Sequence, residues 1–469
     1  MNCFLAAESI IRLELNYWVD FENKYESWFK LSLQHRARNL TDQIQEPLPA
    51  ETTPRSQASK AALFFIFATV LFDTIGFGII IPVLPGLVVG FVGGNTAQGA
   101  EVFGLFGTTW ALMQFLFAPL LGALSDRYGR RPVLILSAFG LGIDYIIMAL
   151  APNLTWLFFG RVVSGITSAS FTVSFAYVAD TTPGEKRAGA YGMIGSIFGV
   201  GFIIGPLVGG LLAGIGPRFP FWGAAALSLA SAAYGLIVLP ESLLLEHRRP
   251  VSLRRANPIG SLSMIRGRKG LAGFVTINFL NFLAFQVLPS IYVLYAAYRY
   301  GWGYATVGAA LALVGASNII VQGLLVRRVV TRFGERTALL IGIISGTVGF
   351  VTWGLAPNSL LFMIAIIFYA PIGFVQPALQ GLMTRRVGPS EQGQLQGING
   401  SLLGLTGVIG PTLFTLIFAF FISSQAPVNL PGAPFLLSAL LMISSLILTA
   451  KVTRAKDQSS ASNKPSELY

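Results

Sequence analysis

Three ionisable residues lie inside long apolar stretches of this chain: Asp73, Asp144 and Arg161. A charged side chain at the centre of a membrane-spanning helix costs about 2.5–3.5 kcal/mol on the insertion scale, so each of the three indicates a function. Burial away from water favours the neutral form of a carboxyl group, and a nearby cation favours the ionised form. A carboxyl group that alternates between a proton and a cationic partner can therefore couple proton movement to another process.

Helix geometry predicts that two of these residues meet. Asp144 lies about 18 Å along a helix from Pro132, and Arg161 lies about 10 Å from Leu154, at 1.5 Å per residue. Because the two stretches run antiparallel across a core of about 30 Å, we expect Asp144 and Arg161 to interact, directly or through water. A static ion pair between helices is the alternative, but it leaves Asp73, near the midplane, unexplained. We predict Asp73 and Asp144 as proton sites, with Arg161 tuning their proton affinity.

The composition shows what kind of element must position these residues. Of 469 residues, 54% are hydrophobic and 11% are charged, and the mean hydropathy is +0.67. Soluble domains contain about 25% charged residues, so we predict an all-α integral membrane protein. The apolar runs are too long for the walls of a barrel and lack its alternation. Twelve transmembrane helices are predicted, roughly at 61–90, 102–124, 132–150, 154–178, 189–214, 219–239, 270–297, 303–327, 336–355, 358–380, 394–422 and 431–450.

Two motifs recur 205 residues further along the chain. SDRYGRR at 125–131 returns as VTRFGER at 330–336. The series Gly192, Gly195, Ser196, Gly199, Gly205, Pro206 returns as Gly397, Gly400, Ser401, Gly404, Gly410, Pro411. One offset for two distant motifs indicates duplication, which is typical of secondary transporters. We predict two pseudo-symmetric six-helix halves, 61–239 and 270–450, joined by a basic linker at 240–269. Polar segments flank them: a flexible extension at 1–60 and a tail at 451–469.

Basic residues predict the orientation of the helices in the membrane. If the amino terminus is cytoplasmic, basic clusters lie in the loops on that side, whereas the opposite loops hold only Arg218 and Arg299. This asymmetry predicts that both termini are cytoplasmic. It also accounts for the net charge of +12 through contacts with anionic lipid, so we expect no nucleic-acid partner.

Several functional classes lack their sequence signals. The chain has one cysteine, Cys3, and two histidines, His35 and His247, which lie in polar segments, so we expect no metal site. It shows no nucleotide-binding loop and no nucleophile motif. We therefore expect no enzymatic activity and no cofactor, and an ion gradient as the source of energy.

Small residues predict close helix contacts and bends. Gly201, Gly205, Pro206, Gly209 and Gly210 lie along one face of the fifth predicted helix, where they let another backbone approach. Packing alone would also explain them. The segment from Gly78 to Pro85 similarly predicts a broken first helix beside Asp73.

Polar residues predict a gate and a cavity. In the short turn GALSDRYGRR at 122–131, Asp126 and Arg130 can pair and clamp the turn. Seven amides in the second half either line a pocket or bridge helices: Asn278, Asn281, Gln286, Asn318, Gln322, Gln376 and Gln380. We predict a substrate cavity formed by Asp73 with Asn278, Gln286, Asn318 and Gln322.

Several of these motifs together resemble one family. Gly122 to Pro132 resembles the cytoplasmic hairpin signature of the major facilitator superfamily, and Arg161 to Gly165 resembles its helix-4 arginine motif. Gly201 to Gly210 resembles the helix-5 motif of its proton-driven antiporters. The segments at 72–85, 141–150, 160–170, 179–182, 377–381 and 391–397 resemble the bacterial tetracycline:proton antiporters.

The resemblance implies a fold, an activity and roles for residues. It implies a monomer in the bacterial inner membrane that exports a metal–tetracycline chelate in exchange for protons, by rocking two halves about a cavity. Asp73, Asp144 and Arg161 match the branch's membrane charges, and Gln286 matches its helix-7 glutamine. The gate of the family matches Gly122, Asp126, Arg127, Gly129, Arg130 and Arg131.

The chain departs from that branch at two titratable positions. Asn318 and Gly346 stand where well-known members carry a histidine and an aspartate. Proton binding would then rest on the first half, and the substrate stays open between tetracycline, a related drug and a metabolite. A metabolite symporter or facilitator, or a sensor that does not transport, are the alternatives. The hairpin, Asp73 and Arg161 favour transport.

Overall fold

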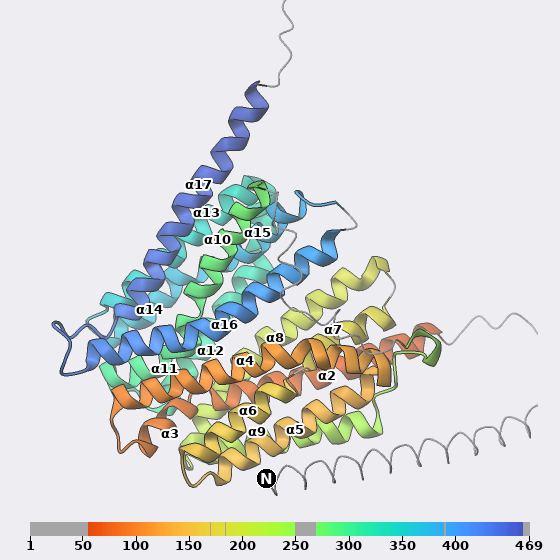
Figure 1. Ribbon diagram of the computed structural model, residues 1–469, viewed down its shortest axis with the longest axis horizontal. Helices are drawn as coiled ribbons and strands as arrows, with labels where there is room; N and C mark the ends of the chain where they lie inside the picture. Colours follow the sequence, from red (N-terminus) through yellow and green to blue (C-terminus); the bar gives the residue numbers. More distant parts are fainter. Residues whose placement is uncertain (1–54, 169, 183, 249–268, 389–390, 463–469) are drawn as a thin grey trace, which may run out of the picture. The chain divides into compact units, whose positions relative to one another are not determined.

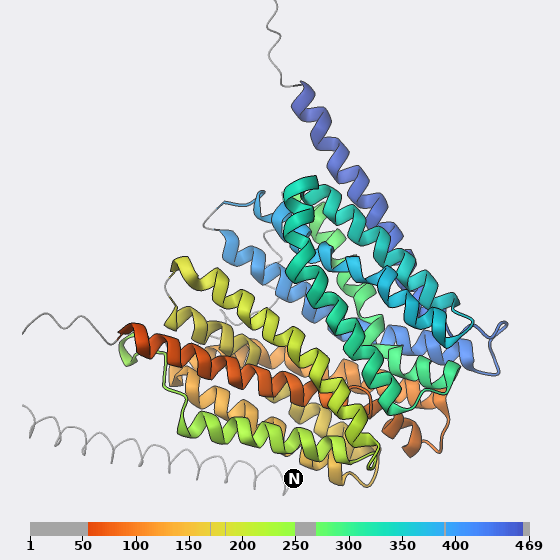
Figure 2. The ribbon, with the colours of Figure 1, turned by 180° about the vertical axis from the view of Figure 1, so that it is seen from behind.

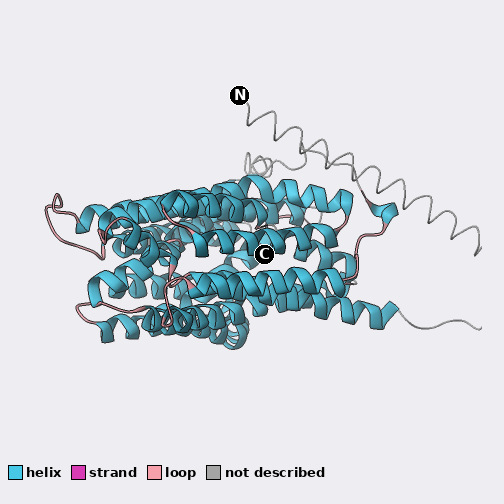
Figure 3. Cartoon of the chain, turned by 90° about the horizontal axis from the view of Figure 1, so that it is seen from below, coloured by secondary structure: helices cyan, strands magenta, loops and turns pink. Residues whose placement is uncertain are grey.

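The computed structural model describes residues 55–168, 170–182, 184–248, 269–388 and 391–462. The chain divides into two units, 1–57 and 58–469, and only residues 55–57 of the first are described. The predicted extension at 1–60 and linker at 240–269 thus lie mostly outside the described residues. Within the described ranges all regular structure is helical and no strand occurs (Figure 3).

The first half contains six predicted spans, two of which are broken into two helices each; their course is drawn in Figure 1. Its helices are α2 (Arg55–Ile80), α3 (Leu84–Phe91), α4 (Thr96–Tyr128), α5 (Arg130–Leu150), α6 (Leu154–Thr167), α7 (Ser170–Thr181), α8 (Gly184–Ala213) and α9 (Phe219–Ile237), followed by the short η1 (Leu245–His247). The predicted break beside Asp73 is confirmed. Pro82 and Pro85 lack the N–H groups that would continue α2 into α3.

The second half repeats this order. Its helices are α10 (Lys269–Phe285), α11 (Val287–Tyr300), α12 (Tyr304–Ile320), η3 (Val321–Leu325), α13 (Val326–Leu355), α14 (Ser359–Tyr369), η4 (Ala370–Phe374), α15 (Val375–Thr384), α16 (Gln392–Ile422) and α17 (Ala433–Ser462). The break between α10 and α11 falls at Gln286, 205 residues after Ile81 in the first break. Asn153 caps α6 and Asn358, at the same offset, caps α14, each accepting a backbone N–H.

The prediction of twelve spans is consistent with the structure. Eleven described helical stretches are long and apolar enough to cross a membrane, and the longest, Tyr304–Leu355, holds two passes. Gly334 divides it with φ of 81°, and Gly129, 205 residues earlier, divides α4 from α5 with φ of 106°. Only glycine adopts such backbone angles without strain, so both halves turn their hairpins in the same way.

The outer surface is apolar, as a membrane requires. Phe64, Leu136, Ile237 and Leu360 expose between 60% and 83% of their side-chain surface. The chain is therefore a multi-pass membrane protein whose exposed leucines and phenylalanines contact lipid. The two halves meet mainly where α4 packs on α16 and α8 packs on α12 (Figures 1 and 2).

Candidate functional site: a cavity between the halves

A cavity of about 2050 Å³ lies between the two halves. Among its described lining residues, Asp73 of α2 and Arg161 of α6 are the charged ones. Small residues of the repeated motif line it from both halves: Gly192, Gly195, Ser196, Gly199 and Pro206 of α8, and Gly397, Gly400, Ser401, Gly404 and Pro411 of α16. Because these residues are small, the two facing walls leave room between them for a large ligand.

The surroundings of the glycines show which end of the cavity is open. Near the end of α8, a Cβ atom on Gly210 would lie 2.7 Å from the Tyr304 carbonyl oxygen of α12. Near the start of α4, a Cβ on Gly107 would lie 2.8 Å from Pro411. Gly192, close to the start of α8, has no atom within 4 Å of its Cβ position. The cavity is therefore closed near the end of α8 and the start of α4. It is open at the opposite end, which carries the Gly129 and Gly334 hairpins and is here called the hairpin end.

Hydrogen bonds between the halves seal the closed end. Thr108 of α4 donates to the Val408 carbonyl of α16 at 2.8 Å and lies 2.7 Å from the Thr412 hydroxyl. These contacts are few and neutral, so they can break without separating charges. The closed end is therefore suited to opening in another state.

The predicted pair of Asp144 and Arg161 is present. Arg161 Nη2 lies 3.2 Å from Asp144 Oδ2, and the two residues are 5% and 0% exposed. Gly160 permits this approach, because a Cβ there would lie 2.7 Å from Asp144 Oδ1. Asp144 does not line the cavity, whereas Arg161 does. The guanidinium therefore connects a carboxylate behind the wall with whatever occupies the cavity.

Asp73 is the acidic residue among the described residues of the cavity wall. It is 4% exposed and lies on α2, seven residues before the helix ends at Ile80. The opposite sign of Arg161 on the same wall gives the cavity both a cation-attracting and an anion-attracting group. A proton and a cationic ligand would compete for Asp73, because both need its negative charge.

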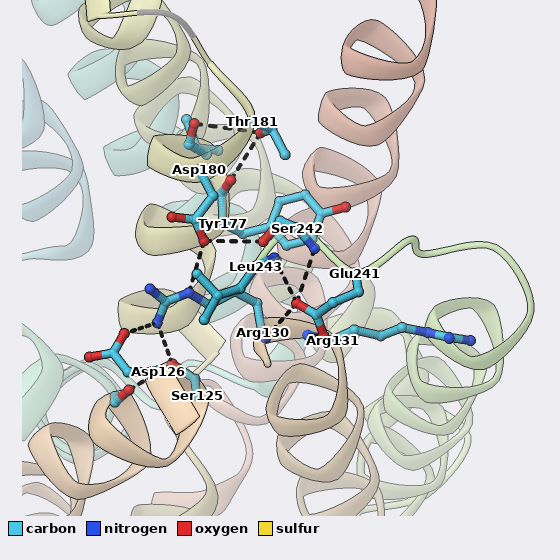
Figure 4. Close-up of polar contacts among 12 residues, drawn as sticks. Ser125, Asp126, Arg130, Arg131, Tyr177, Asp180, Thr181, Glu241, Ser242 and Leu243 are labelled. Carbon is cyan, nitrogen blue, oxygen red and sulfur yellow. Dashed lines mark hydrogen bonds and ion pairs between the residues drawn. The ribbon is translucent and has the colours of Figure 1, made fainter. Parts of the chain in front are cut away.

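The predicted clamp in the hairpin is also present (Figure 4). Arg130 Nη1 lies 2.6 Å from Asp126 Oδ1, and Arg130 Nε lies 3.0 Å from Asp180 Oδ2 at the end of α7. Arg131 instead donates to the carbonyls of Gly235 and Leu236 on α9. The clamp therefore ties three helices of one half together at the hairpin end.

Other predicted gate residues lie around this clamp. Arg127 lies over its neighbouring tyrosine, with its guanidinium carbon 5.1 Å from the ring centroid of Tyr128. Gly122 leaves 3.9 Å between its Cβ position and Thr172 of α7. Gly129 must be glycine for a second reason, because a Cβ there would collide with the Glu241 carboxylate.

Two acids of this network were missed by sequence reasoning. Glu241 Oε1 accepts from the Arg130 backbone N–H at 2.8 Å, and its Oε2 accepts from the Arg131 N–H at 3.2 Å (Figure 4). It therefore caps the start of α5, where a helix has unpaired N–H groups. Asp180 binds both Arg130 and the Ser242 hydroxyl. Asp180 lies at the end of α7 and Glu241 in the segment after α9, where an acid carries no periodic signal.

The helix-5 motif packs α8 against both halves. Cβ atoms on Gly201 and Gly205 would lie 2.5 Å from the Thr74 side chain and 2.6 Å from Gly78 of α2. A Cβ on Gly209 would collide with the Ile79 carbonyl, and Gly210 faces α12. Pro206 lies inside α8, and its carbonyl approaches Gly308 of α12. The motif thus holds α8 close to Asp73 on one side and to the second half on the other.

The structure separates the predicted amides into two groups. Asn281, Gln286, Asn318, Gln322 and Gln376 line the cavity. Asn278 lies outside its lining, because its side chain donates to Asn399 at 2.9 Å and accepts from Gln376 at 3.0 Å. Asn399 in turn donates to Gln380 at 2.7 Å. Asn278 and Gln380 thus bridge helices, so Asn278 does not have the place in the cavity lining that we predicted for it.

The two departures from the tetracycline-exporter pattern have different settings. Asn318 lines the cavity and accepts from Gln322 at 2.8 Å. Gly346 lies outside the described lining, and a Cβ there would be 2.7 Å from Ile372 and 2.7 Å from Met442. Both contacts are with the flexible ends of apolar side chains, so Gly346 lies in an apolar setting that a larger side chain could enter only if Ile372 and Met442 shift.

Aromatic lining residues escaped the sequence analysis as well. Trp110 stacks on Phe77 with ring centroids 5.5 Å apart, and its indole N–H is buried with no partner among the described residues. Tyr292 and Tyr369 line the second half of the cavity. In a chain so rich in aromatic residues, no pattern distinguishes those that face a cavity from those that face lipid.

Comparison with known proteins places this geometry in a family. The profile of the Major Facilitator Superfamily matches residues 66–411 and 276–468. The tetracycline resistance protein, class C, of Escherichia coli is 40% identical over 361 residues, 77% of this chain and 90% of that protein. The class H protein of Pasteurella multocida is 34% identical over 400 residues, 84% of this chain and 98% of that protein.

Solved structures share the fold at lower identity. The human organic anion transporter MFSD10 (TETRAN) superposes with a TM-score of 0.63 at 23% identity, covering 83% of this chain and 99% of that one. The nucleoside transporter NupG gives a TM-score of 0.66 at 14% identity, with 84% and 99% coverage. The order of helices and the two-half architecture described above are thus those of solved transporters.

Proposed function

Because the chain belongs to the major facilitator superfamily, we propose that it is a proton-coupled exporter of tetracycline or a related amphipathic drug, working by alternating access. The observation that carries the proposal is the pairing of a one-ended cavity with three buried charges. Asp73 and Arg161 lie on its wall, and Asp144 lies behind Arg161.

The charges supply the coupling. A cationic metal–drug chelate that enters from the hairpin end is attracted to ionised Asp73, and a proton that reaches Asp73 from the other side removes that attraction. Because one carboxylate cannot serve both at once, the exchange of drug for proton follows from their competition. Arg161 favours the ionised form of Asp144 while the two are paired, and releasing either residue changes the charge of the other's surroundings.

The same reasoning gives the proposed location, oligomeric state, partners and energy source. We place the chain in the bacterial inner membrane as a monomer, with the hairpin end and both termini in the cytoplasm. Lipid, protons and a small molecule are its partners, and nucleic acid is not. The proton gradient supplies the energy and no resident cofactor is needed, since any metal arrives with the drug. The role is transport rather than catalysis.

The test is uptake into inside-out vesicles from an efflux-deficient bacterium that expresses the chain. We expect Mg²⁺–tetracycline to accumulate only while a proton gradient is present, and Asp73→Asn vesicles to show none. Accumulation to equilibrium that ignores a protonophore would indicate a facilitator instead. Absence of uptake for a panel of drugs and metabolites would favour a sensor.

A further inference from the structure

The second half of the cavity wall carries no charged residue among those described, so it must recognise its ligand by neutral groups. Its polar lining consists of amides and hydroxyls, including Asn281, Gln286 and Ser290. Two tyrosines, Tyr292 of α11 and Tyr369 at the end of α14, belong to the same wall. Their environment differs from that of every other polar aromatic group in the cluster around them.

That cluster surrounds Trp353 of α13. The Trp353 ring centroid lies 5.8 Å from that of Tyr292 and 4.6 Å from that of Tyr369. Phe362 packs against Tyr292 at 5.2 Å. Tyr292 and Tyr369 are 0% and 3% exposed, so their rings are fixed by packing.

Four polar aromatic groups of the cluster have partners inside it. Trp353 Nε1 donates to the Phe362 carbonyl at 2.9 Å, and Tyr295 donates to the Trp353 carbonyl at 3.2 Å. Tyr300 donates to the Ala356 carbonyl at 2.8 Å, and Trp302 donates to the Ser359 hydroxyl at 2.7 Å. None of these four lines the cavity.

The two tyrosines that line the cavity are the exception. The hydroxyls of Tyr292 and Tyr369 are buried and have no hydrogen-bond partner among the described residues. Leaving a buried hydroxyl without a partner is unfavourable, and native structures rarely do so without reason. The cluster thus satisfies its internal groups and leaves two buried hydroxyls without a partner, both on residues that belong to the cavity wall.

Tyr369 also packs against the residue of the second half that corresponds to Asp144 in the repeat. Gly349 lies 205 residues after Asp144, and a Cβ on Gly349 would be 2.7 Å from Tyr369 Cβ. The side of the helix that carries the buried acid in the first half is therefore covered by Tyr369 in the second. A neutral aromatic residue therefore packs against the helix at the position where the first half carries a buried acid.

We propose that Tyr292 and Tyr369 form a hydrogen-bonding subsite for the oxygen groups of a planar, oxygen-rich substrate, whose charged part binds at Asp73 and Arg161. This subsite rests on the proposed export function and specifies its substrate class. Keto, enol, hydroxyl and amide oxygens pair with tyrosine hydroxyls without bringing a charge into the neutral wall. The ligand completes bonds that the protein leaves open.

The test removes the hydroxyls alone. Tyr292→Phe and Tyr369→Phe keep the rings that pack on Trp353, and Tyr300→Phe is the matched control, because its hydroxyl binds within the cluster. Affinity for two probes is measured by equilibrium dialysis of the purified full chain: Mg²⁺–tetracycline, which is rich in oxygen, and tetraphenylphosphonium, an aromatic cation with no hydrogen-bonding group. Melting temperature is recorded in parallel.

We expect each cavity variant to weaken Mg²⁺–tetracycline binding about fivefold to tenfold, the size of one lost hydrogen bond, and to leave tetraphenylphosphonium binding and the melting temperature unchanged. Tyr300→Phe should lower the melting temperature and spare both affinities. Unchanged tetracycline affinity, an equal loss for both probes, or a wild-type chain that binds only tetraphenylphosphonium would overturn the subsite.

The same measurement separates the subsite from the export function. Binding in detergent needs no proton gradient, so tyrosine-dependent binding without proton-driven uptake would refute the proposed function and leave the subsite standing. Proton-driven uptake with tyrosine-independent binding would refute the subsite alone.

Discussion

Asp73 of the first half and Asn278 of the second lie 205 residues apart, each a few residues before a break in its helix. Asp144 and Arg161 correspond in the same way to Gly349 and Ile366. The scaffold was duplicated with its caps and glycine turns, but the buried charged residues in the described part of the chain all lie in the first half. We therefore propose that the first half is specialised for protons, and the second for neutral recognition of the substrate.

The largest effect should come from replacing Asp73 of the first half with asparagine, the residue found at the equivalent position of the second half. Asp73→Asn removes the charge for which proton and drug compete, so proton-driven accumulation in vesicles should fall to background. Binding of a neutral ligand should change little, because the amide keeps the size of the carboxyl group.

The reciprocal change provides the control. Adding Asn278→Asp to Asp73→Asn should not restore transport, because Asn278 is held by Asn399 and Gln376 away from the cavity lining. Recovery of uphill export by the double variant would show that the halves are interchangeable, against the specialisation argued here.

A second substitution replaces the arginine of the buried pair with the apolar residue found at the equivalent position of the second half. Arg161→Ile copies Ile366 and leaves Asp144 buried beside an apolar chain, so stability should fall by about 3–5 kcal/mol. Thermal unfolding in detergent measures the loss. Adding Asp144→Asn should recover much of it, since the uncompensated acid is then gone; a double variant no more stable than the single one would argue against the pairing.

The two hairpins carry the same ion pair with opposite polarity. Arg130 pairs with Asp180 in the first half, and Glu335 pairs with Arg385 at 2.9 Å, both residues 205 positions further on. Arg130 and Asp180 expose 10% and 21% of their side chains, whereas Arg385 exposes 73%. The first pair is enclosed and carries additional partners, so it should matter more.

Reversal of the enclosed pair should be costly. Asp180→Arg places two cations together and frees the Ser242 contact, so we expect a loss of about 1.5–3 kcal/mol and slow turnover with near-normal drug binding. Arg130→Glu with Asp180→Arg copies the polarity of the second half, and recovers only part because Asp126 remains. Steady-state uptake and binding, measured together, decide this; normal turnover in Asp180→Arg would rule out the clamp as a gate.

The smallest effect is expected in the second hairpin. Arg385→Ala removes the exposed partner of a pair whose glutamate, Glu335, is 14% exposed. Because the arginine is 73% exposed, the pair should contribute only about 0–1 kcal/mol, and melting temperature and export should stay near those of the wild type. A loss as large as that of Asp180→Arg would mean that the two hairpins share the gate equally.

The sequence predicted those features of the fold that follow from hydrophobic periodicity and from the positions of charged residues. The order of spans, the break after Gly78 and the meeting of Asp144 with Arg161 follow from hydropathy, proline chemistry and helix rise. It did not predict Glu241 as the cap of α5 or the open hydroxyl of Tyr369, because both depend on which distant helix packs beside them. Nor could it separate Asn281, which lines the cavity, from Asn278, which does not.

Proton release during drug binding tests the central claim most directly. Preformed Mg²⁺–tetracycline is mixed with purified protein in a weakly buffered solution containing a pH indicator, at a pH where part of the population carries the proton. The account predicts that the wild type releases protons as it binds, and that Asp73→Asn releases none. Binding without release in the wild type, or equal release from Asp73→Asn, would contradict it.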